Sequence, residues 1–148
     1  MLMAAEPVQQ INVVPDALVD LDFIVPLLGF PKLTRYRLQH PKPGPLWWLE
    51  SLQQSDVNFC LLAPFSAGLD WDLVIAPDDL ADIGAKTVTE VDVFTVVVLH
   101  ADPAQVRTNL RAPILVCRRS AQAKQLVLND ARLPLRLPLR DINSGLRF

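Results

Sequence analysis

The chain has 148 residues, of which 51% are hydrophobic and 20% charged, a composition typical of one globular domain and not of a disordered chain. Its longest apolar stretch, Val93 to Leu99, is much shorter than the roughly 20 residues that span a bilayer, so a membrane helix is excluded. Thirteen prolines leave room for a long helix only within 78–102, which is rich in strand-favouring residues. The composition therefore excludes a helical bundle and favours an all-β fold.

The formal net charge of −2 hides a strong segregation along the chain. Residues 50–102 hold ten acidic residues and one basic residue, Lys86, whereas residues 103–148 hold two acidic and nine basic residues. Such segregation produces a surface field unless folding places the two regions side by side.

The first half of the chain predicts several short strands. Two apolar runs, Gln10–Val14 and Leu21–Val25, are followed by Leu33–Leu38, where large and polar residues alternate. After a proline-rich loop, the runs 46–52 and 57–62 flank the turn-like 53–56 and predict a hairpin with one buried face. Alternation within this hairpin predicts that one ring of the Trp47-Trp48 pair enters the core and the other faces outward.

Two short helices are predicted between the strands. The first begins with Asp78, whose carboxylate can cap the first turn, and ends at Gly84. The second begins at Asp102-Pro103, a cap followed by a first-turn proline, and places Val106 and Leu110 on one face.

The second half of the chain predicts three further strands, at 87–99, 114–117 and 125–129. The tail 133–139 alternates apolar residues but contains two prolines, so it can only be an edge strand or an extended arm. Alternation within the strands predicts a core that contains Leu49, Phe59, Leu61, Val96, Val98, Ile114, Val116 and Val127.

The common catalytic motifs do not occur in the sequence. It lacks a Gly-rich phosphate loop, a Cys-x-x-Cys pair and a His-Glu-x-x-His motif, and its only histidines are His40 and His100. His100 and Asp102 are spaced as a base and its orienting carboxylate, or as a strand end and a helix cap. We favour the second interpretation and expect no catalytic residue, no cofactor and no metal site.

Two charged regions admit a binding role. The acidic run Asp70-Trp71-Asp72, with the acidic residues at 78, 79 and 82, suits a hard cation or a solvated face, and it lacks the spacing of a calcium loop. The basic C-terminal third suits an RNA-binding stripe, but residues 95–147 contain no aromatic side chain for base stacking. We therefore expect a solvated acidic face and no sequence-specific RNA recognition.

The cysteines and the N-terminal residues indicate the cellular compartment of the protein. Cys60 and Cys117 each lie in an apolar run, and neither a basic n-region nor a long h-region begins the chain. Two buried thiols without a secretory signal predict a cytoplasmic protein and no disulfide framework.

Several motifs, in order over about residues 20–139, resemble the flagellar assembly factor FliW family. The run 46–52 (LWWLESL) resembles the family's aromatic-Trp-Leu-Gln-Ser-Leu strand, and 78–84 (DDLADIG) resembles its acidic helix. The most specific match is 102–114 (DPAQVRTNLRAPI), where the family has Asp-Pro, a short helix and Thr-x-Asn-Leu-x-Ala-Pro-Ile. Four departures mark a divergent member: Leu27-Leu28-Gly29-Phe30 for a Gly-Leu-Pro-Gly-Phe turn, Ala63 for an acid, Leu69-Asp70-Trp71-Asp72 for a Pro-Asp-Tyr-Glu-like run, and Leu137 for a His.

The resemblance implies a single all-β domain over residues 1–148, a partly closed β-barrel with two short helices. The N-terminal few residues and the C-terminal tail lie outside the family-like core and are candidates for flexible ends. It also implies a non-enzymatic flagellar assembly factor in the bacterial cytoplasm, which binds flagellin and antagonises the RNA-binding translational regulator CsrA. The alternative is a small-ligand or RNA-binding β-barrel module without a flagellar role.

Seven residues are the candidate partner-binding residues: Asp70, Trp71, Asp72, Asp78, Asp79, Asp82 and Asn109. The acidic ones are expected to face CsrA, because an RNA-binding regulator displays positive surface for phosphates. Asn109 is expected to be structural before it contacts any partner, since its short amide can satisfy loose backbone groups.

Overall fold

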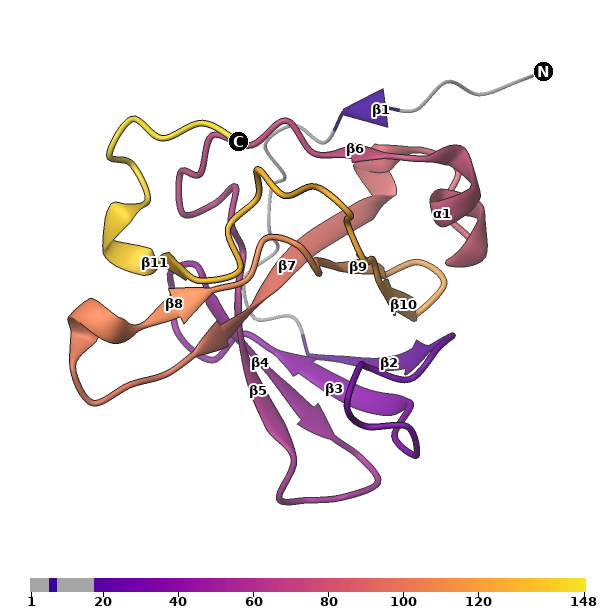
Figure 1. Ribbon diagram of the computed structural model, residues 1–148. Helices are drawn as coiled ribbons and strands as arrows, with labels where there is room; N and C mark the ends of the chain where they lie inside the picture. Colours follow the sequence, from indigo (N-terminus) through magenta and orange to yellow (C-terminus); the bar gives the residue numbers. More distant parts are fainter. Residues whose placement is uncertain (1–5, 8–17) are drawn as a thin grey trace.

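The computed structural model describes residues 6–7 and 18–148, and short strands dominate it (Figure 1). The elements in chain order are β1 (Glu6–Pro7), β2 (Val19–Phe23), β3 (Arg35–Gln39), β4 (Leu46–Ser51), β5 (Asn58–Leu62), β6 (Val74–Ile75), α1 (Pro77–Asp82), η1 (Val88–Glu90), β7 (Val91–Val98), η2 (Pro103–Gln105), β8 (Arg107–Thr108), β9 (Ile114–Cys117), β10 (Gln122–Gln125), β11 (Leu137–Pro138) and η3 (Leu139–Asp141). The predicted strand Gln10–Val14 lies outside the described residues. Over the range that is described, no helix has the length and apolar character needed to cross a membrane.

Seven strands close into a barrel in the order β7-β5-β4-β3-β2-β10-β9, and β9 pairs back with β7. Residues 91–94 of β7 pair with β9, and residues 95–97 pair with β5. Neighbouring strands are antiparallel except β2 and β10, which are parallel. β8 and β11 extend the sheet from β7 outside the barrel. The predicted all-β barrel is confirmed.

Aromatic side chains fill the barrel interior. Trp47 stacks on His40 at a centroid distance of 4.1 Å and meets Phe94 edge to face at 5.3 Å. Tyr36 packs edge to face against Phe23 at 5.2 Å. Trp47 is fully buried whereas Trp48 is 39% exposed, so the predicted division of the tryptophan pair is confirmed.

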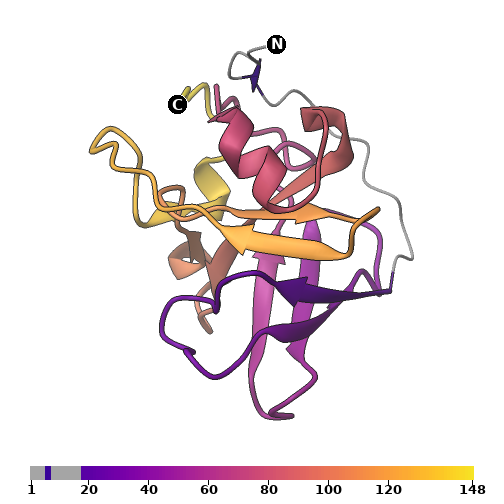
Figure 2. The same ribbon diagram turned by 90° about the vertical axis from the view of Figure 1, so that its right-hand side faces the viewer.

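A second apolar layer covers the outside of the barrel along β7 and β9. Val91 and Val93 face this layer, while Phe94, on the other face of β7, faces the barrel interior. The cover comes from the segment leading to β6, from α1 and from residues 126–137. Figure 2 shows α1 above the two strands of the β9–β10 hairpin. β9 is therefore buried on both faces, and its four residues form a continuous apolar run.

The two predicted helices differ from the observed ones. α1 begins at Pro77 and receives no side-chain cap, so the predicted cap by Asp78 is wrong. The fixed φ of the proline at the first helical position favours the start of the helix there instead. Gly84 follows α1 with φ of +72°, which confirms the predicted end. The second predicted helix is only a 3₁₀ turn, η2, because the chain extends into β8 directly after it, and Val106 and Leu110 share no helix face.

One predicted strand is wrong. β10 ends at Gln125, and the chain then leaves the sheet. The N–H groups of Leu126 and Leu128 bond instead to the carbonyls of Pro113 and Arg111, at 2.8 and 2.7 Å. Both leucines face the outer apolar layer, and Val127 between them is 61% exposed, contrary to its predicted core position.

The rest of the predicted core is largely confirmed. Leu49, Leu61, Ile114 and Val116 are fully buried, while Phe59 and Val96 are half-buried against the barrel interior. Val98 is 48% exposed at the end of β7, and Val97 is the buried residue instead. In the tail, β11 pairs with β8 alone, as the predicted edge strand requires.

Replacing Phe94 by Ala is expected to cost about 3–5 kcal/mol, because it leaves a cavity beside Trp47 in the barrel interior. Val98→Ala, at an exposed position of the same strand, is expected to change stability by less than about 0.5 kcal/mol. Urea unfolding of both variants measures the difference. Equal losses would contradict the burial of Phe94 in the barrel interior.

Candidate partner-binding site

The acidic segment contains one core residue. Trp71 is 5% exposed and stacks on Phe65 at a centroid distance of 6.0 Å. Asp70 and Asp72 flank it and are exposed, as strand-like alternation requires. Trp71 is thus a structural member of the outer apolar layer, and its two acidic neighbours are the exposed part of the run.

The fold neutralises much of the charge segregation of the sequence. Basic residues of the C-terminal third pair with acidic residues of the middle: Arg118 with Asp92, Arg119 with Glu90, Lys124 with Asp79 and Asp82, and Arg147 with Asp70. Throughout the described part of the chain, Asp72 and Asp78 have no ion-pair partner. Uncompensated negative charge on the candidate site is therefore confined to these two residues.

Lys124 holds the acidic helix against the barrel. Its Nζ lies 2.9 Å from carboxylate oxygens of both Asp79 and Asp82, and its side chain is only 15% exposed. Desolvation lowers the pKa of Lys124, but hydrogen bonds to Asp82 and Asp79 outweigh it and raise the pKa. Asp79 and Asp82 are thus fastened to β10, whereas Asp78 on the same helix is exposed and free of ion pairs among the residues described.

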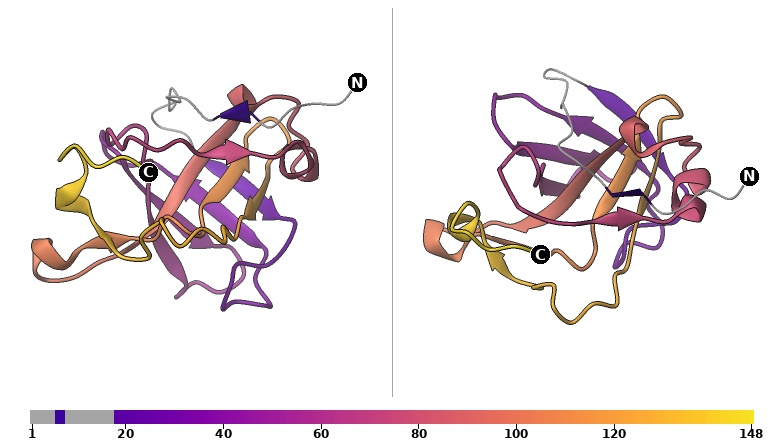
Figure 3. Two further views of the ribbon diagram at one scale, coloured as in Figure 1. Left: turned by 45° about the horizontal axis from the view of Figure 1, so that its top comes forward. Right: turned by 90° about the horizontal axis from the view of Figure 1, so that it is seen from above.

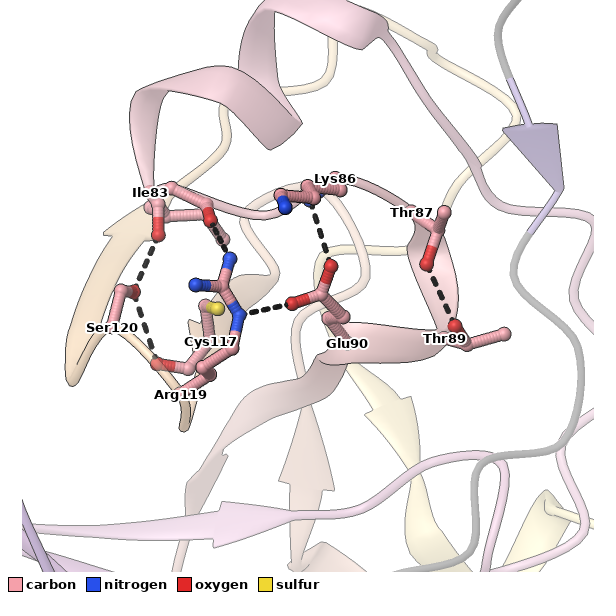
Figure 4. Close-up of polar contacts among 9 residues, drawn as sticks. Ile83, Lys86, Thr87, Thr89, Glu90, Cys117, Arg119 and Ser120 are labelled. Carbon is pink, nitrogen blue, oxygen red and sulfur yellow. Dashed lines mark hydrogen bonds and ion pairs between the residues drawn. The ribbon is translucent and has the colours of Figure 1, made fainter.

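A second set of contacts secures the loop after α1 (Figure 4). Arg119 donates to the Glu90 carboxylate and to the carbonyl of Gly84, and Ser120 Oγ donates to the carbonyl of Ile83. The hydrogen bond from Arg119 lowers the pKa of Glu90, and the N–H of Lys86 lowers it further. The β9–β10 turn therefore fixes where α1 lies on the barrel.

A cleft adjoins the acidic run. We call it the large cleft; it has a volume of about 620 Å³ between residues 71–74, residues 127–133 and residues 147–148. Trp71, Leu73 and Leu133 contribute apolar lining. The charged residues that line it are Asp72, Asp130, Arg132 and Arg147.

A second, small cleft of about 430 Å³ lies on the other side of residues 127–130, which line both. Asn109, Arg111 and the exposed Leu135 contribute to its walls. Val127, the most exposed apolar residue of this region, lines both clefts. The structure therefore brings the candidate residues Trp71, Asp72 and Asn109 to one surface, on two sides of a shared segment.

Asn109 shapes the small cleft through Arg111. Its Oδ1 accepts the backbone N–H of Arg111 at 2.8 Å, and Arg111 in turn donates from Nε to the carbonyl of Leu133 at 2.7 Å and from Nη2 to that of Ala131. Asn109 follows β8 and not a helix, contrary to the predicted location. Its hydrogen bond is nevertheless the expected structural one.

His100 and Asp102 form a turn. Nδ1 of His100 accepts the backbone N–H of Asp102 at 2.9 Å, and the Asp102 carboxylate accepts the N–H of Ala104 at 3.0 Å. The carboxylate thus faces the start of η2 and does not orient the imidazole. No group of three or more His, Cys, Asp or Glu residues suited to a metal ion occurs within residues 6–7 and 18–148.

Comparison with known proteins identifies the family. The family model described as FliW protein matches residues 3–139. The chain belongs to the FliW family. The flagellar assembly factor FliW of Syntrophotalea carbinolica is 31% identical over 118 residues, covering 79% of this chain and 84% of that one. The FliW of Caldicellulosiruptor saccharolyticus is 28% identical over 120 residues, covering 80% and 79% of the two chains.

The fold agrees with that assignment. The crystal structure of a flagellar assembly factor FliW superposes with a TM-score of 0.74 at 18% identity, and the match covers 90% of this chain and 96% of that one. The FliW family model ends at residue 139, so Arg147 and Phe148, which line the large cleft, lie beyond the matched region.

Two contributors to the site, residues 127–133 and residues 147–148, were not predicted from the sequence. Residues 125–129 were predicted as a strand, although the polar cluster Asn129-Asp130 after Leu128 was a signal that the strand ends. No local pattern around Arg147-Phe148 indicates that it lies beside Asp70, because that contact joins segments more than 70 residues apart.

Asn109→Ala is expected to destabilise the FliW fold by about 1–2 kcal/mol, because the N–H of Arg111 loses its acceptor. Asn109→Asp keeps the acceptor oxygen and is expected to retain most of the stability. Thermal unfolding of the two variants, followed by circular dichroism, tests the role. A melting temperature unchanged in Asn109→Ala would show that the hydrogen bond is dispensable and would contradict the structural role of Asn109.

Proposed function

We propose that this chain is a non-enzymatic flagellar assembly factor that binds flagellin and antagonises a CsrA-type RNA-binding regulator by protein–protein contact in the bacterial cytoplasm. Membership of the FliW family carries this proposal. The two partners compete for the chain, so the level of free flagellin controls the translation of its own message. Binding of these two partners requires no catalysis, cofactor or membrane.

The large cleft and the small cleft together form the surface that best suits an elongated protein partner. Together they form two adjoining depressions with exposed apolar residues at Val127, Val74 and Leu135. Interfaces are built around such apolar anchors with a polar rim. We assign flagellin to this surface.

The free carboxylates of Asp72 and Asp78 are assigned to CsrA. A basic RNA-binding surface is attracted by uncompensated negative charge, and the same charge repels incoming RNA. The pairing of Asp79 and Asp82 with Lys124 gives them a structural role first. Asp72 also lines the large cleft, and this shared location would make the two partners compete.

Two observations weigh against an RNA-binding or ligand-binding barrel. Arg118, Arg119, Lys124 and Arg132 are each paired with an acidic side chain, which removes much of the basic stripe that the sequence suggested. The barrel interior is packed with Trp47, Tyr36 and Phe94, all of them fully buried.

Val127→Asp is expected to abolish capture of flagellin, because a carboxylate on the segment shared by both clefts would be desolvated on binding. Its side chain is 61% exposed, so the melting temperature is expected to stay within a few degrees of wild type. Val25→Asp is the matched control, since Val25 is 58% exposed and lines neither cleft. Equal capture by the two variants would place the flagellin site elsewhere.

The double variant Asp72→Asn/Asp78→Asn is expected to slow association with CsrA about 2- to 10-fold at low salt and to weaken the salt dependence of the rate. Asp56→Lys changes the net charge by the same amount in the exposed β4–β5 turn and serves as the control. Stopped-flow measurements at low and high salt compare the three proteins. Identical salt slopes for wild type and the double variant would contradict the electrostatic assignment.

A further inference from the structure

The C-terminal segment, residues 143–148, contacts the acidic run through its last two residues. The N–H of Phe148 donates to the carbonyl of Asp70 at 2.9 Å, and the N–H of Asp72 donates to the carbonyl of Phe148 at 2.7 Å. This is a parallel bridge between Asp70 and Arg147. Figures 1 and 3 show the chain end beside the segment that leads to β6.

Side chains add three further contacts. Arg147 pairs with the Asp70 carboxylate at 2.9 Å, and Phe148 packs against the outer apolar layer where it lines the large cleft. Asn143 Nδ2 donates to the carbonyl of Ala67 at 2.9 Å. Gly68 leaves the room for this amide, because a Cβ at Gly68 would collide with the Asn143 side chain.

These contacts hold the segment in place weakly. The side chains of Arg147 and Asp70 are 79% and 54% exposed, and exposed ion pairs contribute only about 0–1 kcal/mol. Residues 143–147 are exposed throughout. Segments with few buried contacts and solvent-exposed hydrogen bonds open at a low free energy. The segment also lies beyond residues 3–139, which the FliW family model matches.

We propose that the Asp70–Asp72 backbone and the large cleft form a docking site for an extended peptide segment of a partner, in which a basic residue precedes a large apolar residue. The C-terminal segment is the intramolecular occupant of this site, and the partner segment displaces it. The identity of the partner rests on the proposed function; the chemistry of the site does not.

Each feature of the expected ligand follows from a contact of the present occupant. The carbonyl of Asp70 and the N–H of Asp72 provide main-chain hydrogen bonds of the kind that recruit an added strand. The Asp70 carboxylate selects the basic residue. The next side chain, now Phe148, packs against the outer apolar layer and lines the large cleft together with Trp71, Leu128 and Leu133.

The probe is a fluorescein-labelled peptide with the sequence of residues 143–148, NSGLRF, and the matched control peptide is NSGLEF. The protein is the full chain, as wild type and as Arg147→Glu, in which Asp70 repels the chain's own segment. A tethered occupant competes at an effective concentration on the order of millimolar. Fluorescence anisotropy is therefore expected to give at least ~10-fold tighter binding of NSGLRF to Arg147→Glu than to wild type, with little binding of NSGLEF to either.

A charge exchange completes the test. Asp70→Arg is expected to reverse the preference, so that NSGLEF binds it more tightly than NSGLRF does. In wild type, the NMR signals of the Arg147 and Phe148 amides are expected to move toward those of an unstructured chain end when unlabelled NSGLRF is added at millimolar concentration, because the segment loses its contacts to Asp70 and Asp72. This measurement needs no variant to fold. Equal affinity of NSGLRF for wild type and Arg147→Glu, or unmoved Arg147 and Phe148 amides, would overturn the proposal. Neither assay contains flagellin or CsrA, so failure here is distinct from failure of the proposed function.

Discussion

The pairing of β7 with strands on both sides is the constraint on which the molecule depends. Its first four residues pair with β9 and the next three pair with β5, so one strand of eight residues joins the two ends of the sheet. Closure removes the exposed edges that an open sheet would present. It also leaves β7 with two buried faces, one toward the barrel interior and one toward the outer apolar layer, and that second layer carries every segment of the candidate site.

The register of β7 and β9 also places charges. Asp92 lies opposite Val116, and Arg118, two residues further along the same face, reaches its carboxylate. Burial raises the pKa of Asp92 more than the Arg118 guanidinium lowers it. Arg118 also lies 5.4 Å from the centre of the Trp47 ring. Desolvation offsets much of the attraction within such a pair, so its clearest consequence is geometric: it ties the end of β9 to the barrel interior.

Alternation of apolar and polar residues correctly predicted the strands that have one buried and one exposed face. In the hairpin of β4 and β5, β4 alternates buried and exposed residues, and the division of Trp47 and Trp48 follows from that period. The same reasoning was less successful in β7, because strands buried on both faces do not alternate. Val98 was predicted in the core but is 48% exposed, whereas its neighbour Val97 is buried. It failed again after Gln125, where tertiary hydrogen bonds to Pro113 and Arg111 replace the ladder.

The sequence predicted some residues of the candidate site but not its shape, because the shape depends on contacts between segments far apart in the chain. Asp72 and Asn109 were identified from charge and motif, yet the clefts that they line also need residues 127–133 and the chain end. The segregation of charge along the sequence was recognised correctly, but the ion pairs that neutralise much of the acidic segment in the fold were not predicted. Lys124 and Arg147 return to the acidic segment from positions more than 40 residues away, and of the candidate acidic residues they leave only Asp72 and Asp78 without an ion pair among the residues described.

The departures from the family pattern acquire different meanings in the fold. Ala63 lies in the barrel interior and Leu137 in the outer apolar layer, 3% and 4% exposed, so both are changes in packing behind the surface. The run Leu69-Asp70-Trp71-Asp72 is different, because its backbone and carboxylates lie at the large cleft and hold the C-terminal segment. A closed barrel keeps its shape when such a peripheral run changes, since none of its seven strands includes it. Divergence in partner recognition is therefore expected to concentrate at residues 69–72 and at the segment that covers them, while the barrel stays that of the family.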